Sequence, residues 1–272
     1  MSTTLRQTMS LPQIEWPSAD HIYFAPHPDD VVLSCGGTIH QQRQRGEAVV
    51  AVTVFSGSPD PEKPLSPFAQ KYHEHWLSVV EDQPTDLVDP MALRRLEDRQ
   101  SFDALDEGIW VIQLGLLDCI YRTHNETGEH LYLSVDDLFG EVHPADPALR
   151  ALDDLSVPDH VHLYLPLTIG NHVDHQIVRR AFEGRAELQG RLSFYEDYPY
   201  AASSDPTEFV DAAWGAQPVF LNDADLDAKI RAVAQHQSQL STFWADEHTM
   251  AQEIRQFAQQ RGGEVFWRRQ AD

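Results

Sequence analysis

The chain has 272 residues, enough for one sizeable α/β domain with its own core or for two small ones, and one domain is favoured. Its formal charge of −23 at pH 7 argues against nucleic acid and anionic membranes as partners, because both would be repelled. Apolar residues make up 42% of the chain, which excludes disorder as the default, and two cysteines, Cys35 and Cys119, are too few for a disulfide framework.

The first 18 residues are polar and include Pro12 and Pro17, so residues 1–18 are predicted to form an arm on the surface. Residues 19–272 are predicted to form a single domain. The first ten residues contain one arginine and lack an apolar core, so no signal peptide is expected. No apolar run approaches the roughly 18 residues of a membrane-spanning helix. The sequence therefore predicts a cytoplasmic protein without membrane insertion.

The domain is predicted to begin with a βαβ unit. Residues 21–25 form an apolar strand, residues 32–45 form a helix that ends before Gly46, and residues 48–55 form a valine-rich strand. A continuous apolar run of that kind is typical of a parallel strand buried on both faces. The loop 56–67 is rich in Ser, Pro and Gly, and it leaves the carboxyl end of this strand.

Strands and helices continue to alternate along the rest of the chain. Helices are predicted at residues 68–80, 89–105, 172–188, 225–242 and 249–261. Strands are predicted at residues 109–115, 160–165, 192–195 and 219–221, with a final edge strand at 264–268. The pattern weakens between residues 121 and 158, where a turn and short helices could cover a substrate. This alternation predicts an α/β, Rossmann-like three-layer fold with a mostly parallel sheet and its site at the carboxyl ends of the strands.

One imidazole and two carboxylates follow the first strand directly, as His27, Asp29 and Asp30. Histidine nitrogen and aspartate oxygen are ligands of zinc-type metals, and a partner from elsewhere would complete an open site. The segment His172-Val173-Asp174-His175 supplies such a partner, because residues three apart on a helix share a face. Taken singly, His27 could cap a turn, the two aspartates could begin a helix, and the later histidines could lie on the surface. The two segments together favour a metal site.

These motifs resemble those of the LmbE-like, or PIG-L, family of zinc-dependent N-acetylglucosaminyl deacetylases. The resemblance rests on Pro26-His27-Pro28-Asp29-Asp30, with Gly36-Gly37-Thr38 behind it, and on the His-Val-Asp-His segment. Further motifs follow in family order: Arg94-Arg95-Leu96-Glu97-Asp98, Leu114-Gly115-Leu116-Leu117-Asp118, Phe194-Tyr195-Glu196-Asp197-Tyr198-Pro199-Tyr200 and Ser238-Gln239-Leu240. The likeness covers about residues 20–269. Two departures, Val31 in place of a glutamate and Gly170 in place of a tyrosine, leave the identity of the substrate open.

The resemblance implies a zinc site with His27, Asp30 and His175 as ligands, where zinc lowers the pKa of a water toward about 7. It also implies that Asp29 is the general base that takes a proton from this water. A positioned base typically contributes about 10²–10⁴-fold in rate. Other divalent metals could occupy the same ligands.

Amide hydrolysis passes through a tetrahedral oxyanion, which needs a positive or hydrogen-bonding partner, and the amine must leave protonated. We assign His172 as oxyanion stabiliser and general acid, with Asp174 orienting an imidazole in the site. For substrate contact there are four candidates, although the first could be a helix-surface arginine and the second a loop-capping aspartate: Arg95, Asp118, Glu196 and Asp197.

The predicted function is a metal-dependent hydrolase that removes an acetyl group from an N-acetylated amino sugar or a related small glycoconjugate. Two alternatives stay open: a hydratase of an unsaturated carboxylic acid on the same scaffold, and a non-catalytic sugar-binding protein. The loops after the strands carry more acidic than basic residues, which favours neutral hydroxyl-rich sugars, although Arg95 and Arg122 could bind one anionic group. A homo-oligomer is compatible with the sequence.

Overall fold

The computed structural model describes residues 14–78 and 89–270. Most of the predicted N-terminal arm, residues 1–13, lies outside this range. Its last residues are described, and Ile14 and Trp16 pack against the core of the domain. The indole Nε1 of Trp16 donates a 2.9 Å hydrogen bond to the carbonyl of Ser156.

The described residues form a sheet of seven strands in the order β3-β2-β1-β4-β5-β7-β6. The first five strands along the chain are parallel, whereas β7 is antiparallel to both β5 and β6. The strands are β1 (His21–Ala25), β2 (Val49–Thr53), β3 (Trp110–Gln113), β4 (His162–Pro166), β5 (Leu192–Tyr195), β6 (Trp214–Val219) and β7 (Glu264–Arg269). This arrangement confirms the predicted α/β fold with a mostly parallel sheet.

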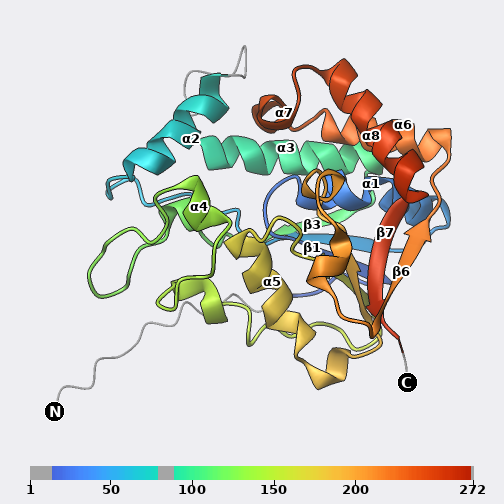
Figure 1. Ribbon diagram of the computed structural model, residues 1–272, viewed down its shortest axis with the longest axis horizontal. Coiled ribbons are helices and arrows are strands. Elements are labelled where there is room, and N and C mark those ends of the chain that lie inside the picture. The colour runs from blue at the N-terminus through green and yellow to red at the C-terminus, as the bar shows by residue number, and fades with distance from the viewer. Residues whose placement is uncertain (1–13, 79–88, 271–272) are drawn as a thin grey trace.

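Helices cover both faces of the sheet (Figure 1). The α-helices are α1 (Asp30–Gln44), α2 (Pro67–Ser78), α3 (Pro90–Leu105), α4 (Val135–Leu138), α5 (Val173–Glu183), α6 (Asp223–Val233), α7 (Gln237–Phe243) and α8 (Glu247–Arg261). Short 3₁₀ helices are η1 (Cys119–Tyr121), η2 (Pro147–Arg150), η3 (Ala186–Leu188), η4 (Tyr200–Ala202) and η5 (Pro206–Phe209). None of the described helices is both long and apolar enough to span a bilayer.

Two cores lie on the two faces because successive side chains of a strand point in opposite directions. On one face Phe24 joins a core with Ile177 and Phe182 of α5. On the other face Tyr23 joins a core with residues of α1, α3, α6 and α8, including Ile39 and Phe102. The first strand is buried on both faces, as its continuous apolar sequence requires.

Several predicted boundaries change in the structure. The predicted helix 225–242 is two helices, because the chain turns between Val233 and Gln237. This turn brings the backbone N–H and hydroxyl of Ser238 to the carboxylate of Glu97, at 2.8 and 2.6 Å. The predicted strand 264–268 is present as β7, but its expected position at the edge is wrong, because β7 lies between β5 and β6. Strand β6 begins at Trp214, earlier than predicted, and only Trp214 of its six residues is buried, so it lacks an apolar pattern.

The parallel strands bring five loops to one edge of the sheet. The predicted strand 21–25 is confirmed, and residues 26–30 follow it into α1, two residues earlier than predicted. Residues after β4 lead to α5, which begins at Val173 with His172 as its N-cap. Because α5 ends at Glu183, with Gly184 as its C-cap, it is also shorter than the predicted helix 172–188. The loops after β2, β3 and β5 end at the same edge and complete the surroundings of His27.

Candidate active site

His27 lies at the end of β1 between two buried carboxylates. Its Nε2 atom is 2.9 Å from Oδ2 of Asp174, and its Nδ1 atom is 3.3 Å from Oδ2 of Asp30. The same oxygen of Asp30 accepts a 2.7 Å hydrogen bond from the backbone N–H of His27. The two ring nitrogens therefore face different carboxylates, one of them supplied by the first turn of α5.

His175, in the first turn of α5, is held in the same way from the opposite side. Its Nδ1 atom is 2.6 Å from Oδ1 of Asp197, and its Nε2 atom is 3.3 Å from Oδ2 of Asp30. The other oxygen of Asp197 accepts a 2.9 Å hydrogen bond from the backbone N–H of Ile169. One oxygen of Asp30 thus lies between a nitrogen of each imidazole.

The negative charges of the buried carboxylates in this cluster favour the binding of a cation. Burial alone would lower the pKa of the imidazoles, but the neighbouring carboxylates raise the pKa of His27 well above its usual value and that of His175 to about 9. Burial would raise the pKa of Asp30, yet the imidazoles, with His175 first, hold it well below its usual value. Protons on the ring nitrogens balance the buried carboxylates in the metal-free protein, and a divalent cation could replace them.

The residues present fit a zinc-type ion. Nitrogen atoms of His27, His172 and His175 lie within 4.8 Å of one another, and all three side chains are buried. Asp30 adds an oxygen beside two of these nitrogens, and two imidazoles with one carboxylate are the donor set of an open catalytic zinc site. His27 and His175 each also have a carboxylate at the other nitrogen, as metal-binding histidines ordinarily do.

Asp29 stands beside this donor set and has a separate partner. Its backbone has φ of 118°, an uncommon left-handed conformation for a residue other than glycine, and such strain concentrates at functional sites. Its Oδ2 atom is 3.6 Å from Nη2 of Arg94, which also donates a 3.1 Å hydrogen bond to the carbonyl of Pro28. Burial raises the pKa of Asp29 to about 7, opposed by Arg94. A carboxylate of this kind can accept a proton near neutral pH.

His172 is the N-cap of α5, one residue before the helix. Its Nδ1 atom accepts a 3.3 Å hydrogen bond from the backbone N–H of Asp174, so the neutral ring carries its proton on Nε2. Burial, followed by the nearby charge of His27, lowers the pKa of His172 well below its usual value. The ring is 4.9 Å from that of His27 and 5.4 Å from that of His175. A neutral imidazole here is a hydrogen-bond donor beside the predicted metal ligands.

Two predicted substrate contacts, Arg95 and Glu196, do not reach this cluster. Arg95 donates hydrogen bonds to the carbonyl of Ser56 and the hydroxyl of Ser58, at 2.7 and 2.9 Å, so it holds the loop after β2. Arg94 faces Asp29 instead, because one residue along a helix turns the side chain by about 100°. The sequence analysis missed Arg94, although it stands in the quoted Arg-Arg motif.

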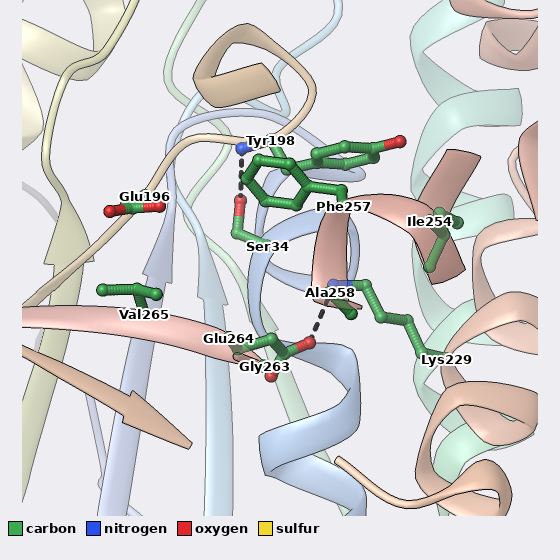
Figure 2. Close-up of a pocket in the computed structure, with 10 residues that line it drawn as sticks. All are labelled: Ser34, Glu196, Tyr198, Lys229, Ile254, Phe257, Ala258, Gly263, Glu264 and Val265. Atoms are coloured by element: carbon green, nitrogen blue, oxygen red, sulfur yellow. Dashed lines mark hydrogen bonds and ion pairs between the residues drawn. The ribbon is translucent and has the colours of Figure 1, made fainter. Parts of the chain in front are cut away.

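Glu196 is also directed away from the site. Its carboxylate pairs with Arg261 and accepts a 3.0 Å hydrogen bond from Nε1 of Trp267. Figure 2 shows it beside a small cavity that is lined by residues of α1, α6, α8 and β7, among them Ser34. Consecutive residues of an extended chain point in opposite directions, so Asp197 reaches His175 while its neighbour does not.

Asp118 does lie at the site, whereas Arg122 cannot bind a substrate there. Oδ2 of Asp118 is 3.6 Å from Nε2 of His27, and Oδ1 accepts a 3.2 Å hydrogen bond from the backbone of Ile120 at the start of η1. Arg122 is 2% exposed, and its guanidinium lies between buried carboxylates, so the prediction that it could bind an anionic group is wrong.

Aromatic side chains that the sequence analysis did not select surround the histidines. The ring of Tyr200 is 6.4 Å from that of His175, and the ring of Phe139 is 5.4 Å from that of His172. Gly170 has φ of 89°, and a Cβ atom there would be 3.0 Å from the ring of Tyr200. The glycine therefore makes room for that tyrosine. Val31, in α1, is buried in the hydrophobic core on the same face of the sheet as Tyr23.

Comparison with known proteins identifies the family of this chain. The family model described as PIG-L: GlcNAc-PI de-N-acetylase matches residues 22–184, which include both histidine motifs. The chain belongs to the PIG-L family. The match ends before Asp197, which the structure places behind His175.

Proteins named as deacetylases are similar to most of the chain. The chain is 28% identical over 240 residues to a 2'-N-acetylparomamine deacetylase of Niallia circulans, covering 83% of this chain and 82% of that protein. Its fold is similar to a zinc-inhibited form of teicoplanin deacetylase, with TM-score 0.70, 26% identity, and coverage of 93% and 99% of the two chains. A deacetylase of the A40926 pseudoaglycone is similar over the same shares, with TM-score 0.68 and 27% identity.

Proposed function

We propose that this PIG-L protein is a zinc-dependent N-deacetylase that acts on an N-acetylated amino sugar within a small glycoconjugate. The observation that carries the proposal is that His27, Asp30 and His175 lie around one point, with Asp29 beside them and outside this ligand set, where it pairs with Arg94. The similar proteins, deacetylases of 2'-N-acetylparomamine, teicoplanin and the A40926 pseudoaglycone, support the same reaction class.

His27, Asp30 and His175 would hold the metal, with Asp174 and Asp197 keeping the two imidazoles in position. Bound there, zinc would act as a Lewis acid on the amide carbonyl and lower the pKa of a water molecule. Every other step depends on side chains of the chain itself.

Asp29 takes a proton from the water that attacks the amide carbon, because it is a buried carboxylate outside the ligand set. The Nε2–H of His172 donates a hydrogen bond to the oxyanion that forms at the carbonyl oxygen. The C–N bond then breaks, and the proton held by Asp29 passes to the leaving nitrogen, which gives acetate and a free amine. A neutral His172 suits the oxyanion role better than the general-acid role.

The sugar would lie between aromatic rings and a carboxylate. Tyr200 and Phe139 stand next to the histidines and offer apolar faces, while Asp118 offers an oxygen to a sugar hydroxyl. Arg94 is paired with Asp29 and Arg122 is buried, so cations for a polyphosphate group are lacking among these neighbours. We expect neutral or amino-bearing glycoconjugates to be preferred over polyanionic ones.

Acetate release from a panel of N-acetylated compounds tests the proposal. We expect turnover of an N-acetylated pseudodisaccharide and of neutral N-acetylglucosamine conjugates, with weak turnover of free N-acetylglucosamine, because remote contacts position the amide. Zinc content is measured on the same samples, and hydration of a conjugated carboxylic acid is assayed beside them. Protein that binds stoichiometric metal but releases no acetate, or that hydrates the acid instead, would refute the proposal. A nucleotide-linked sugar as much the best substrate would refute its electrostatic part.

A further inference from the structure

A row of buried charged side chains extends from His27 into the segment after β3. Oδ2 of Asp174 faces His27, and its Oδ1 is 2.5 Å from Nη2 of Arg122. Arg122 is in turn 2.9 Å from Oδ2 of Asp146. Asp174 is 0% exposed, and Arg122 and Asp146 are 2% and 4% exposed. The substrate cannot contact side chains buried to this extent, and Asp174 is the member of the row that faces His27.

The guanidinium of Arg122 is held by two hydrogen bonds, two ion pairs and two aromatic rings. Its Nε atom donates a 3.0 Å hydrogen bond to Asp146, and its Nη1 atom donates one of 3.0 Å to the carbonyl of Leu117. Its Nη2 atom makes the ion pairs with Asp146 and Asp174 and has no hydrogen bond among the described residues. The rings of Phe55 and Tyr132 lie 5.0 and 5.4 Å from its central carbon. Together these contacts restrict the orientation of the planar group.

Asp146 is anchored separately from the site. Its Oδ2 atom accepts a 2.6 Å hydrogen bond from the hydroxyl of Tyr132, and its Oδ1 atom accepts one of 2.8 Å from the backbone N–H of Ala148. The Tyr132 hydroxyl also accepts a 3.0 Å hydrogen bond from the backbone of His143. The segment between β3 and β4 is therefore folded around these charges.

The consequence for Asp174 is geometric. Because Oδ1 is ion-paired with Arg122, rotation of the carboxylate is restricted, and its Oδ2 faces Nε2 of His27 and accepts a hydrogen bond from the backbone N–H of Cys119, 3.1 Å away. The ring of His27 is then held with Nδ1 facing Asp30. Residues behind metal-binding histidines fix the ring orientation and the nitrogen that is free for the metal.

We propose that Arg122 is a positioning residue for the metal site, which acts through Asp174 on His27 and so sets the affinity for zinc. This inference rests on the metal site of the proposed function. The segment from η1 to η2, expected to be a cover for the substrate, thereby supports the metal centre as well.

The test compares zinc affinity in full-length variants. Arg122→Met removes the charge and the donors but keeps much of the side-chain volume, and Arg122→Lys keeps a charge that cannot bridge two carboxylates in the same way. Arg185→Met is the matched control, because Arg185 also binds several carbonyls and lies 4.8 Å from the ring of Phe182, at a distance from the site. Metal-free protein is titrated with Zn²⁺ in competition with a chromophoric chelator, and folding is followed by circular dichroism.

We expect Arg122→Met to raise the Kd for zinc by about 10–100-fold, as is typical when a partner of a metal-binding histidine is lost. Arg122→Lys should show a smaller increase. Arg185→Met should lower the melting temperature and leave the Kd within about twofold of the wild type, since it has no link to His27. Co²⁺-loaded Arg122→Met should also have an altered visible absorption spectrum, which loss of stability alone would not produce.

Three outcomes separate the possibilities. Wild-type protein that binds no zinc would refute the proposed function itself. Folded Arg122→Met with wild-type zinc affinity would overturn only the positioning role of Arg122. If Arg122→Met does not fold, Asp146→Asn decides, because it frees the other end of the guanidinium and keeps the volume: a raised Kd supports the role, and an unchanged Kd overturns it.

Discussion

Replacing Asp197 by asparagine should weaken zinc binding while leaving the metal-free fold nearly intact. In the wild type both oxygens of Asp197 accept hydrogen bonds from N–H groups, one from Nδ1 of His175 at 2.6 Å and one from the backbone of Ile169 at 2.9 Å. An asparagine has one acceptor and one donor at these two places. If its oxygen faces Ile169, its NH₂ group meets Nδ1 of His175, which must then give up its proton.

The cost depends on whether metal is bound. In the metal-free protein, His175 can lose the proton on Nδ1 and keep the one on Nε2, which faces Asp30 at 3.3 Å, so all groups stay paired. Zinc needs Nε2 free, which returns the proton to Nδ1 and leaves a buried N–H facing an NH₂ group. An unpaired buried donor costs about 1–3 kcal/mol. Since 1.4 kcal/mol is a factor of ten, zinc affinity should fall by about 5–150-fold.

The assay is a chelator-competition titration of metal-free Asp197→Asn, with thermal unfolding of the same protein. Asp205→Asn is the control, because Asp205 also accepts a backbone hydrogen bond, of 2.9 Å from Thr207, at an exposed turn. The reasoning would be refuted by an unchanged zinc affinity in Asp197→Asn. A large loss of metal-free stability with normal affinity would also refute it, because the asparagine would then have chosen the opposite orientation.

Three further predictions follow from the site and the core. Asparagine tolerates the positive φ of position 29, so Asp29→Asn should fold and bind zinc but lose at least about 10²-fold in turnover. His175→Ala should bind no zinc when its metal content is analysed. Equal loss of metal in both variants would contradict these roles. Arg94→Met should lower kcat by about 10–100-fold, because the base Asp29 would be misplaced, whereas Arg95→Met should leave kcat within about twofold of the wild type. If steady-state assays showed a larger loss for Arg95→Met than for Arg94→Met, the predicted role of Arg95 in substrate contact would be restored. Burial raises the pKa of Asp98 to about 6, above the usual 3.8, so the folded protein holds this proton to higher pH than the unfolded chain does. Stability relative to Asp98→Asn should therefore fall by about 2 kcal/mol as pH rises from 4 to 7, and urea unfolding with a constant difference between the two proteins would contradict this.

The sequence by itself determined the framework of this protein. Continuous apolar runs at 21–25 and 48–55 can be stable only as strands buried on both faces, and the helices between them follow from their stop signals. Because parallel strands end at one edge of a sheet, the motifs at His27 and His175 could be expected to meet there, and they follow the neighbouring strands β1 and β4. Local pattern and chain direction suffice for conclusions of this kind.

Only the tertiary structure decided which charged side chains serve the site. Arg94 and Arg95 are adjacent in sequence, yet the rotation of the helix sends one to Asp29 and the other to the loop at Ser56. The direction of a side chain depends on partners that are distant in sequence. Asp174 contacts His27, from which it is 147 residues away, and Oδ2 of Asp30 lies 3.3 Å from a nitrogen of each imidazole, that of His27 and that of His175. Composition and spacing carry no information about such partners, because burial and pairing arise when the loops of separate strands come together.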